Sequence, residues 1–126
     1  MTILGRFELV VISVLLGLSE EDAYSVKIRE EIRKFTGHRP WVGQLHATLG
    51  HLVERGLLST SMSAPFPFRG GKPRRLYTIE PAGISALEQN VAALRRTLDA
   101  IDMNALAKLT KGGRGNDLSP QTATAG

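Results

Sequence analysis

Hydrophobic and polar positions alternate along the chain with two periodicities, one typical of helices and one typical of strands. Residues 3–17 are apolar on nearly every side, which predicts a helix enclosed by its neighbours. Two further segments, near 20–36 and 40–55, repeat apolar residues every three or four positions, and each predicts a helix with one buried face. The positions expected to be buried are Tyr24, Ile28, Ile32 and Phe35 in the first of these segments and Val42, Leu45, Leu49, Leu52 and Val53 in the second.

Residues that suit helix ends flank these segments. The sequence SEED at 19–22 has the spacing of a capping box and predicts the start of the second helix. Gly37 is suited to end that helix, because glycine accepts the left-handed conformation of a helix cap. Pro40 is suited to open the third helix.

Strand-like stretches occur at 57–63 and 74–79, on either side of a loop rich in glycine and proline, and this pattern predicts a β-hairpin. Pro81 then suits the beginning of a last helix. Three helices followed by a hairpin is the order of a winged helix-turn-helix, whose third helix enters the major groove and whose hairpin loop is the wing. The predicted fold class is therefore mainly α with a small β-hairpin: a winged helix-turn-helix domain followed by a long C-terminal dimerisation helix.

The last helix has the most regular apolar spacing in the chain. Its apolar residues alternate steps of three and four, as in the a and d positions of a coiled coil. They are Ile84, Leu87, Val91, Leu94, Leu98, Ile101 and Ala105. This seam could pack on the chain's own first helix or on a second copy, and we favour the second copy because the seam is narrow.

These features divide the chain into three parts. We expect a winged helix-turn-helix domain over 1–81 and a dimerisation helix over 82–110. Residues 111–126 contain almost no large apolar side chain, so we expect a disordered tail there.

Positive charge gathers in the predicted wing. The net charge of the whole chain is +4, and four cations fall in the sequence RGGKPRR at 69–75. They are Arg69, Lys72, Arg74 and Arg75. Such a cluster is suited to phosphate or minor-groove contacts, and the alternative is a loop that only discourages aggregation. Arg74 and Arg75 alternate across a strand, so we do not expect both to face the same partner.

The third helix offers candidates for reading bases. Gln44, Thr48 and His51 lie at i, i+4 and i+7 opposite the apolar face, where they would either meet base edges or form an ordinary solvated surface. His46 lies nearer the apolar side, so we expect it to be packed. For Trp41 we favour packing on the domain over contact with a sugar-phosphate backbone.

Composition argues against several other classes of protein. The 126 residues include no cysteine, so disulfides and cysteine-based zinc sites are excluded. His46 and His51 fall on nearly opposite sides of one helix, and no catalytic or phosphate-binding motif is present. We expect no enzyme activity, no metal and no cofactor. The apolar run at 9–18 is too short to span a membrane, for which about 20 residues are needed, and lacks the flanks of a signal peptide, so we expect a cytoplasmic protein with no membrane partner.

Four segments also resemble the PadR family of transcriptional regulators. The sequence LGRFELVVISVLLGL resembles the first helix of that family, and DAYSVKIREEI resembles the second. WVGQLHATLGHLVERGLLS resembles the recognition helix and following strand, and FRGGKPRRLYTIEPAG resembles the wing. The resemblance covers about residues 3–83. It implies a bacterial homodimer, usually a repressor, that dimerises through its final helices and in some members responds to phenolic acids or cationic drugs.

Two positions depart from the family pattern. His46 stands where the family usually has a tyrosine that helps to hold or contact the DNA backbone, so the resemblance adds His46 to the expected DNA contacts. The last helix has no aromatic residue, whereas some drug-binding members sandwich flat ligands between tryptophans there. A small-molecule effector would be expected, by analogy, in the dimer cleft beside the first and last helices.

We therefore predict a sequence-specific, DNA-binding transcriptional regulator. As a homodimer it would bind double-stranded DNA at a pseudo-palindromic operator, with half-sites about 34–36 Å or a multiple apart. One alternative is a protein-interaction module whose wing meets an acidic protein surface. A second is an architectural protein that binds DNA without regard to sequence.

Overall fold

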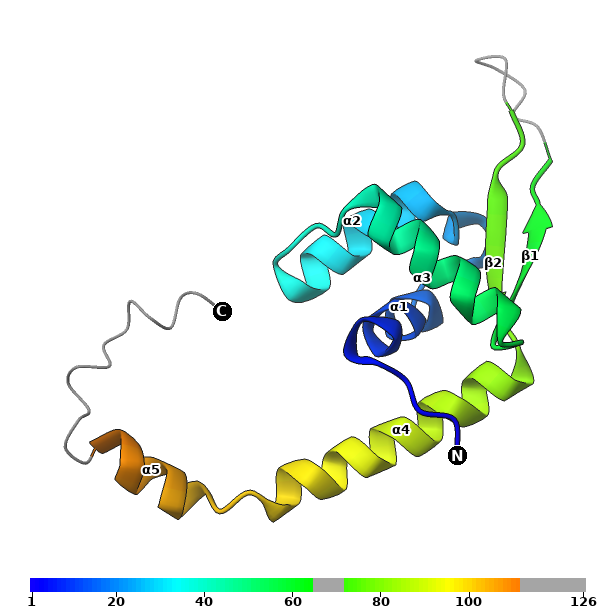
Figure 1. Ribbon diagram of the computed structural model, residues 1–126. Helices are drawn as coiled ribbons and strands as arrows, with labels where there is room; N and C mark the ends of the chain where they lie inside the picture. The colour runs from blue at the N-terminus through cyan, green and yellow to red at the C-terminus, as the bar shows by residue number, and fades with distance from the viewer. Residues whose placement is uncertain (65–71, 112–126) are drawn as a thin grey trace. The chain divides into compact units, whose positions relative to one another are not determined.

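The computed structural model describes residues 1–64 and 72–111 of the chain. Three helices come first: α1 (Arg6–Leu16), α2 (Ser25–Thr36) and α3 (Val42–Glu54), with a short 3-10 turn, η1 (Glu20–Asp22), before α2. Strands β1 (Leu58–Met62) and β2 (Arg75–Ile79) form an antiparallel hairpin, and helices α4 (Pro81–Ala100) and α5 (Met103–Lys111) follow (Figure 1). The predicted order of three helices and a hairpin is confirmed, and with it the winged helix-turn-helix fold, but two helices stand where one long last helix was expected.

A single hydrophobic core joins the first three helices to the base of the hairpin. Its most enclosed side chains are Val11 and Ile12 of α1, Ile28 of α2, and Leu49 and Leu52 of α3, all with no exposed surface. Helix α1 is thus the central element, as its nearly continuous apolar sequence predicted. Burial of apolar side chains at this level is the main source of stability for such a domain.

Two expected core residues lie outside this core. Phe35 is 65% exposed because it is in the last turn of α2, where it borders a hollow beside Val14 and Leu18 at the end of α1. Val42 is 52% exposed because it is the first residue of α3, one turn ahead of the buried Leu45. For both residues, the helical periodicity correctly predicted which face of the helix is apolar. It did not predict how far the core extends along that helix.

The helix ends also differ in part from the prediction. Ser19 caps only η1, without a side-chain hydrogen bond, so the expected capping box is wrong; α2 begins after Tyr24 instead. A carboxylate closes the start of α1, where the Gly5 N–H donates to Glu8 Oε1 at 2.8 Å. Gly37 ends α2 with φ of +87°, the left-handed cap that the sequence predicted.

The hairpin is attached to the helices through its second strand. Leu58 pairs with Ile79 at the buried end of the hairpin, and Met62 pairs with Arg75 at the other end. The Tyr77 N–H donates to the carbonyl of Ala23 at 2.9 Å, so β2 also bonds to the chain just ahead of α2. This bond fixes the direction of the wing relative to the helix-turn-helix.

The start of α4 is packed tightly against the short segment between α3 and β1. The Leu57 carbonyl accepts the Glu80 N–H at 2.9 Å, and a Cβ built on Gly83 would lie only 2.2 Å from that same carbonyl oxygen. Asn90 holds the N-terminal residues: its Oδ1 accepts the Leu4 N–H at 3.0 Å and its Nδ2 donates to the Thr2 carbonyl at 2.7 Å. The beginning of α4 is therefore part of the winged helix domain.

The long last helix is interrupted. Helix α4 ends at Ala100, and Asp102 caps a new helix by accepting the Ala105 N–H at 3.0 Å. The chain divides into two compact units after residue 92, which lies inside α4 and not at this break. The expected boundary lay at 81/82, and the expected tail, 111–126, lies outside the described residues apart from Lys111, the last residue of α5. In the part of the chain that the structure describes, no helix combines the length and apolar character needed to cross a membrane.

Candidate nucleic-acid interface

Helix α3 presents a polar side opposite its buried leucines. Gln44 and His51 are exposed, as their spacing predicted, whereas Thr48 is half-buried. Gly43 and Gly50 add a low surface beside them, since a Cβ built on either glycine would meet nothing within 4 Å. A helix with so little side-chain bulk can come close to another surface.

His46 does not have the packed position expected for it. It is exposed and borders two adjoining hollows, one between α2 and α3 and one between α2, α3 and β2. Helical spacing places His46 toward the apolar side, but the neighbouring elements leave the space beside it open. An imidazole there can donate or accept a hydrogen bond at the surface.

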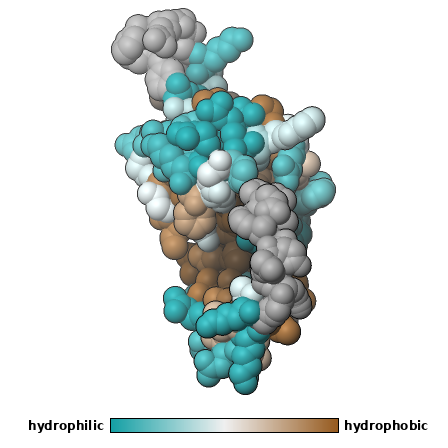
Figure 2. All heavy atoms as spheres, turned by 90° about the vertical axis from the view of Figure 1, so that its left-hand side faces the viewer, coloured by the Kyte–Doolittle hydropathy of each residue, from teal (hydrophilic) through white to brown (hydrophobic). Residues whose placement is uncertain are grey.

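The two hollows form one concave, cationic surface. They share Tyr24, Ser25, Val26 and His46. The first, of about 390 Å³, adds Lys27, Arg29, Glu30, Arg39, Val42 and Leu45, and the second adds Arg74, Arg75 and Tyr77. Five cationic side chains and one carboxylate therefore line this surface. Figure 2 shows hydrophilic residues over the upper part of the turned view and hydrophobic residues gathered in its middle.

The base of the wing has a defined geometry. The Arg74 guanidinium lies over the Tyr24 ring, 3.9 Å from its centroid. The Arg74 backbone N–H donates to Ser63 Oγ at 2.8 Å, and its carbonyl accepts the Ser63 N–H at 2.8 Å. Both the backbone and the side chain of Arg74 are therefore positioned before any ligand arrives. Such a cation–π contact was not foreseeable from the sequence, because Tyr24 is fifty residues away.

The other wing cations are distributed as the alternation of a strand requires. Arg75 and Lys72 are exposed, whereas Arg74 is half-buried against Tyr24. Arg69 lies outside the described residues. Tyr77, whose pKa is raised by burial, stands beside Arg74 and Arg75 in the second hollow.

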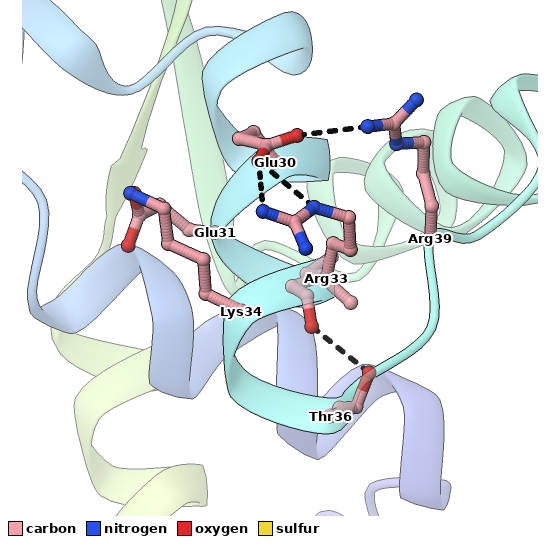
Figure 3. A network of polar contacts seen from close by, with 7 residues as sticks. Glu30, Glu31, Arg33, Lys34, Thr36 and Arg39 are labelled. Atoms are coloured by element: carbon pink, nitrogen blue, oxygen red, sulfur yellow. Dashed lines mark hydrogen bonds and ion pairs between the residues drawn. The ribbon is translucent and has the colours of Figure 1, made fainter.

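Glu30 of α2 forms ion pairs with two arginines, one in α2 and one just before α3. Its carboxylate accepts the Arg33 guanidinium at 2.6 Å and Arg39 at 3.2 Å, and these ion pairs are visible in Figure 3. The hydrogen bond from Arg33 lowers the pKa of Glu30. The pairs are exposed and stabilise the fold little. They do hold Arg39, in the turn before α3, against α2.

Two further arginines serve the scaffold. Arg29 Nε donates to the Pro40 carbonyl at 2.6 Å, which fixes the chain just before α3 begins. Arg55 bonds to Glu8 at 2.9 Å and to the Ile3 carbonyl at 2.9 Å, which ties the end of α3 to the N-terminal segment. Arg55 is thus held away from the polar side of α3, although helical spacing alone would place it there.

Two cations of the concave surface, Lys27 and Arg39, were not among the residues predicted from the sequence. Lys27 and Arg39 are scattered cations that spacing alone places on a solvated face. Only the fold brings the start of α2 beside α3 and β2. Among the described residues, no three His, Cys, Asp or Glu side chains gather into a group that could hold a metal ion.

Three helices, a two-stranded wing and a cationic concave surface between them define a winged helix-turn-helix protein. Residues 14–89 match the model of the PadR-like family of transcriptional regulators. The chain therefore belongs to this family, and it is a DNA-binding transcription regulator. The resemblance seen in the sequence is confirmed over more than half of the chain.

Solved structures share this fold. The chain is similar to a PadR family transcription regulator from Clostridium difficile, with a TM-score of 0.65 and 20% identity over 82% of this chain and 99% of the other. A PadR-like transcription factor from Bacteroides fragilis gives a TM-score of 0.59 and 26% identity over 78% and 88%. H. salinarum RosR gives a TM-score of 0.59 and 19% identity, over 92% of this chain and 96% of the other. Comparison with curated protein sequences gave no match.

Proposed function

We propose that the protein is a sequence-specific repressor that binds a pseudo-palindromic operator as a homodimer. The observation that carries the DNA-binding part is the shared cationic surface of α2, α3 and β2. Arg74 and Arg75 line this surface from the side of the hairpin, whereas the proposed base readers Gln44, Thr48 and His51 lie on α3 outside the two hollows. Lys72, which is exposed just before β2, is assigned to the duplex by its charge. His46 lines the same hollow as Arg74 and Arg75, and we propose that it contacts the duplex backbone. Arg69 belongs to the same proposal through its place in the wing sequence.

The homodimer is supported by apolar side chains that the chain leaves uncovered. Ile84, Leu94, Leu98 and Ile101 are each between 44% and 56% exposed, and every residue of α5 is exposed. Exposed apolar stripes of this kind mark interaction surfaces. We assign the seam Ile84, Leu87, Val91, Leu94, Leu98, Ile101 and Ala105 to a second copy, with Leu87 shared with the chain's own core.

A dimer also gives a reason for a palindromic operator. Two copies related by a two-fold axis present two α3 helices to one face of the duplex, with half-sites about 34–36 Å or a multiple apart. A small-molecule effector would enter at the dimer interface. Because α4 and α5 contain no aromatic residue, a flat ligand would find none of their side chains to stack on.

The first test is selection of duplexes from a random pool by the purified protein at about physiological salt. We expect an inverted repeat with helical-turn spacing. Retention of all duplexes without enrichment would instead identify an architectural binder. No retention of any duplex would favour a protein-interaction module, whose wing meets an acidic protein surface.

Two substitutions separate charge from sequence reading. Lys72→Ala should weaken binding to operator and random duplexes alike. It should also reduce the slope of log K against log salt by about 0.9, because one phosphate is no longer neutralised by the protein. Gln44→Ala should instead relax the preference at one base position by about 1–3 kcal/mol. Binding curves at several salt concentrations measure both. An unchanged slope for Lys72→Ala contradicts the wing assignment, and a uniform weakening for Gln44→Ala shows that it does not read a base.

A further inference from the structure

The sequence favours packing of Trp41 on the domain. In the structure Trp41 instead projects from the domain. Its side chain is 80% exposed, the most exposed of the large hydrophobic residues in the described part of the chain. The neighbouring Val42 is 52% exposed. An indole of this size left in water forgoes the free energy that burial would provide, so a covered state is favourable once a partner is present.

The backbone of Trp41 is nevertheless held firmly. Trp41 is the cap residue of α3, and its carbonyl accepts the Leu45 N–H at 3.0 Å. The carbonyl just before it, that of Pro40, accepts Arg29 Nε at 2.6 Å. The indole therefore projects from a fixed point at the start of α3 rather than from a loose loop.

Cationic and small residues surround Trp41, as expected for a surface that binds a duplex. Arg39 lies two residues before it, Arg29 is bonded to the residue just before it, and both arginines border the cationic hollow between α2 and α3. Gly43, in the first turn of the helix, has nothing within 4 Å of where a Cβ would stand. In Figure 1 α3 begins on the side of the domain toward which the hairpin extends. An apolar ring beside cations and a low glycine surface is complementary to the sugars, base edges and phosphates of one strand.

We infer that Trp41 contacts the duplex at the end of the half-site where α3 begins. This inference rests on the proposed sequence-specific DNA binding. The indole packs against deoxyribose and the exposed edge of a base, where a thymine methyl is the best apolar partner, and its Nε1–H donates to a phosphate. Trp41 thus adds a preference outside the bases that Gln44 and Thr48 reach.

The chain offers a direct readout, because Trp41 is its one tryptophan. The full-length protein is titrated with a dye-labelled duplex from the selected pool, and duplex anisotropy and indole emission are recorded together. Because the duplex would cover the ring, we expect the indole emission to change and acrylamide quenching to fall, both with the same midpoint as the anisotropy. Titration with a duplex that has the terminal A·T pair of the half-site changed to G·C should reduce the emission change.

Variants give the second measurement. Trp41→Ala should weaken operator binding roughly tenfold, as expected for losing about 1.5 kcal/mol of apolar burial, and Trp41→Phe should recover most of it. The matched control is Phe35→Ala, which removes another exposed aromatic at the far end of α2, 65% exposed, and should leave affinity unchanged. Far-UV circular dichroism checks that each variant is folded.

The outcomes separate this inference from the function on which it rests. If anisotropy rises while indole emission, acrylamide quenching and the affinity of Trp41→Ala all stay unchanged, the Trp41 contact is wrong and the DNA-binding function stands. If no duplex raises the anisotropy, the function and the contact both fail. Equal weakening for Trp41→Ala and Phe35→Ala would also overturn the contact, because the effect would not belong to the start of α3.

Discussion

At the scale of single residues, the contact between Tyr24 and Arg74 shows how a wing can be prepared for an anion. A guanidinium stacked on an aromatic ring keeps its charge and its hydrogen-bonding edge but has less freedom to move. The entropic cost of ordering that side chain is thus met before binding. Arg74 should therefore contribute more to duplex affinity than an unstacked arginine at the same distance.

Substitution of Tyr24 tests this pre-organisation. Tyr24→Leu should weaken duplex binding by about 0.5–1 kcal/mol, or roughly two- to fivefold, because the ring that orients Arg74 is gone. Tyr24→Phe keeps the ring and should stay close to the parent protein. Anisotropy titrations of a labelled operator measure both. Equal weakening in the two variants would attribute the effect to the Tyr24 hydroxyl instead.

Sequence reasoning at this scale succeeded where one helix decided the outcome. The exposure of Gln44 and His51 follows from their spacing against Leu45, Leu49 and Leu52. It failed for His46 and Trp41, because their exposure depends on how α2, β2 and the loop before α3 are placed. No spacing within α3 contains that information.

At the scale of elements, the order and approximate bounds of the helices and strands could be predicted, but their closest contact could not. Gly83 looks in the sequence like an ordinary weak point in a helix. In the structure it is the position that lets α4 approach the Leu57 carbonyl, because any Cβ there would overlap the oxygen. The contact joins residues 26 positions apart, so local propensity cannot predict it.

Gly83→Ala should therefore destabilise the domain despite the better helix propensity of alanine. We expect the free energy of unfolding to fall by about 1–3 kcal/mol, as for overpacking in a tight site. Gly50→Ala, in open space on α3, is the control and should instead stabilise by up to about 1 kcal/mol. Urea denaturation measures both. A Gly83→Ala protein at least as stable as the parent would contradict the close packing.

The break between α4 and α5 is a second feature of the elements that the sequence pattern did not predict. The apolar repeat runs through 101–105 without a change of rhythm, and so it predicted one helix. Asp102 nevertheless accepts the Ala105 N–H and starts a new one. An a/d repeat records which residues are apolar, but one capping side chain decides whether the backbone remains continuous.

At the scale of the whole molecule, the uncovered apolar residues of the C-terminal helices call for a partner. The proposed second copy of the chain would cover these residues with matching surfaces on both sides. In that arrangement each protomer supplies one α3 helix, and affinity for the operator depends on both being held together.

Leu98→Glu tests the dimer. Leu98 is 56% exposed in the single chain, and glutamate is nearly as good a helix former as leucine, so the fold should be unaffected. Burial of the new charge against a second copy would be unfavourable, so we expect at least about a tenfold weaker dimer by analytical ultracentrifugation. Gln89→Glu, at an exposed polar position of α4, is the matched control for charge and should leave the dimer intact. A Leu98→Glu protein that still sediments like the parent would remove this residue from the interface.

The bond from the Leu4 amide to Asn90 has a practical consequence for following such a regulator in solution. The two residues are separated by most of the chain, and the bond exists only while the first part of α4 stays docked on the winged helix domain. Exchange of the Leu4 amide proton with deuterated solvent consequently times the undocking of that segment. One peptide from the extreme N-terminus, read by mass spectrometry with and without operator or effector, would therefore report whether a signal at the C-terminal helices reaches the domain that holds the DNA.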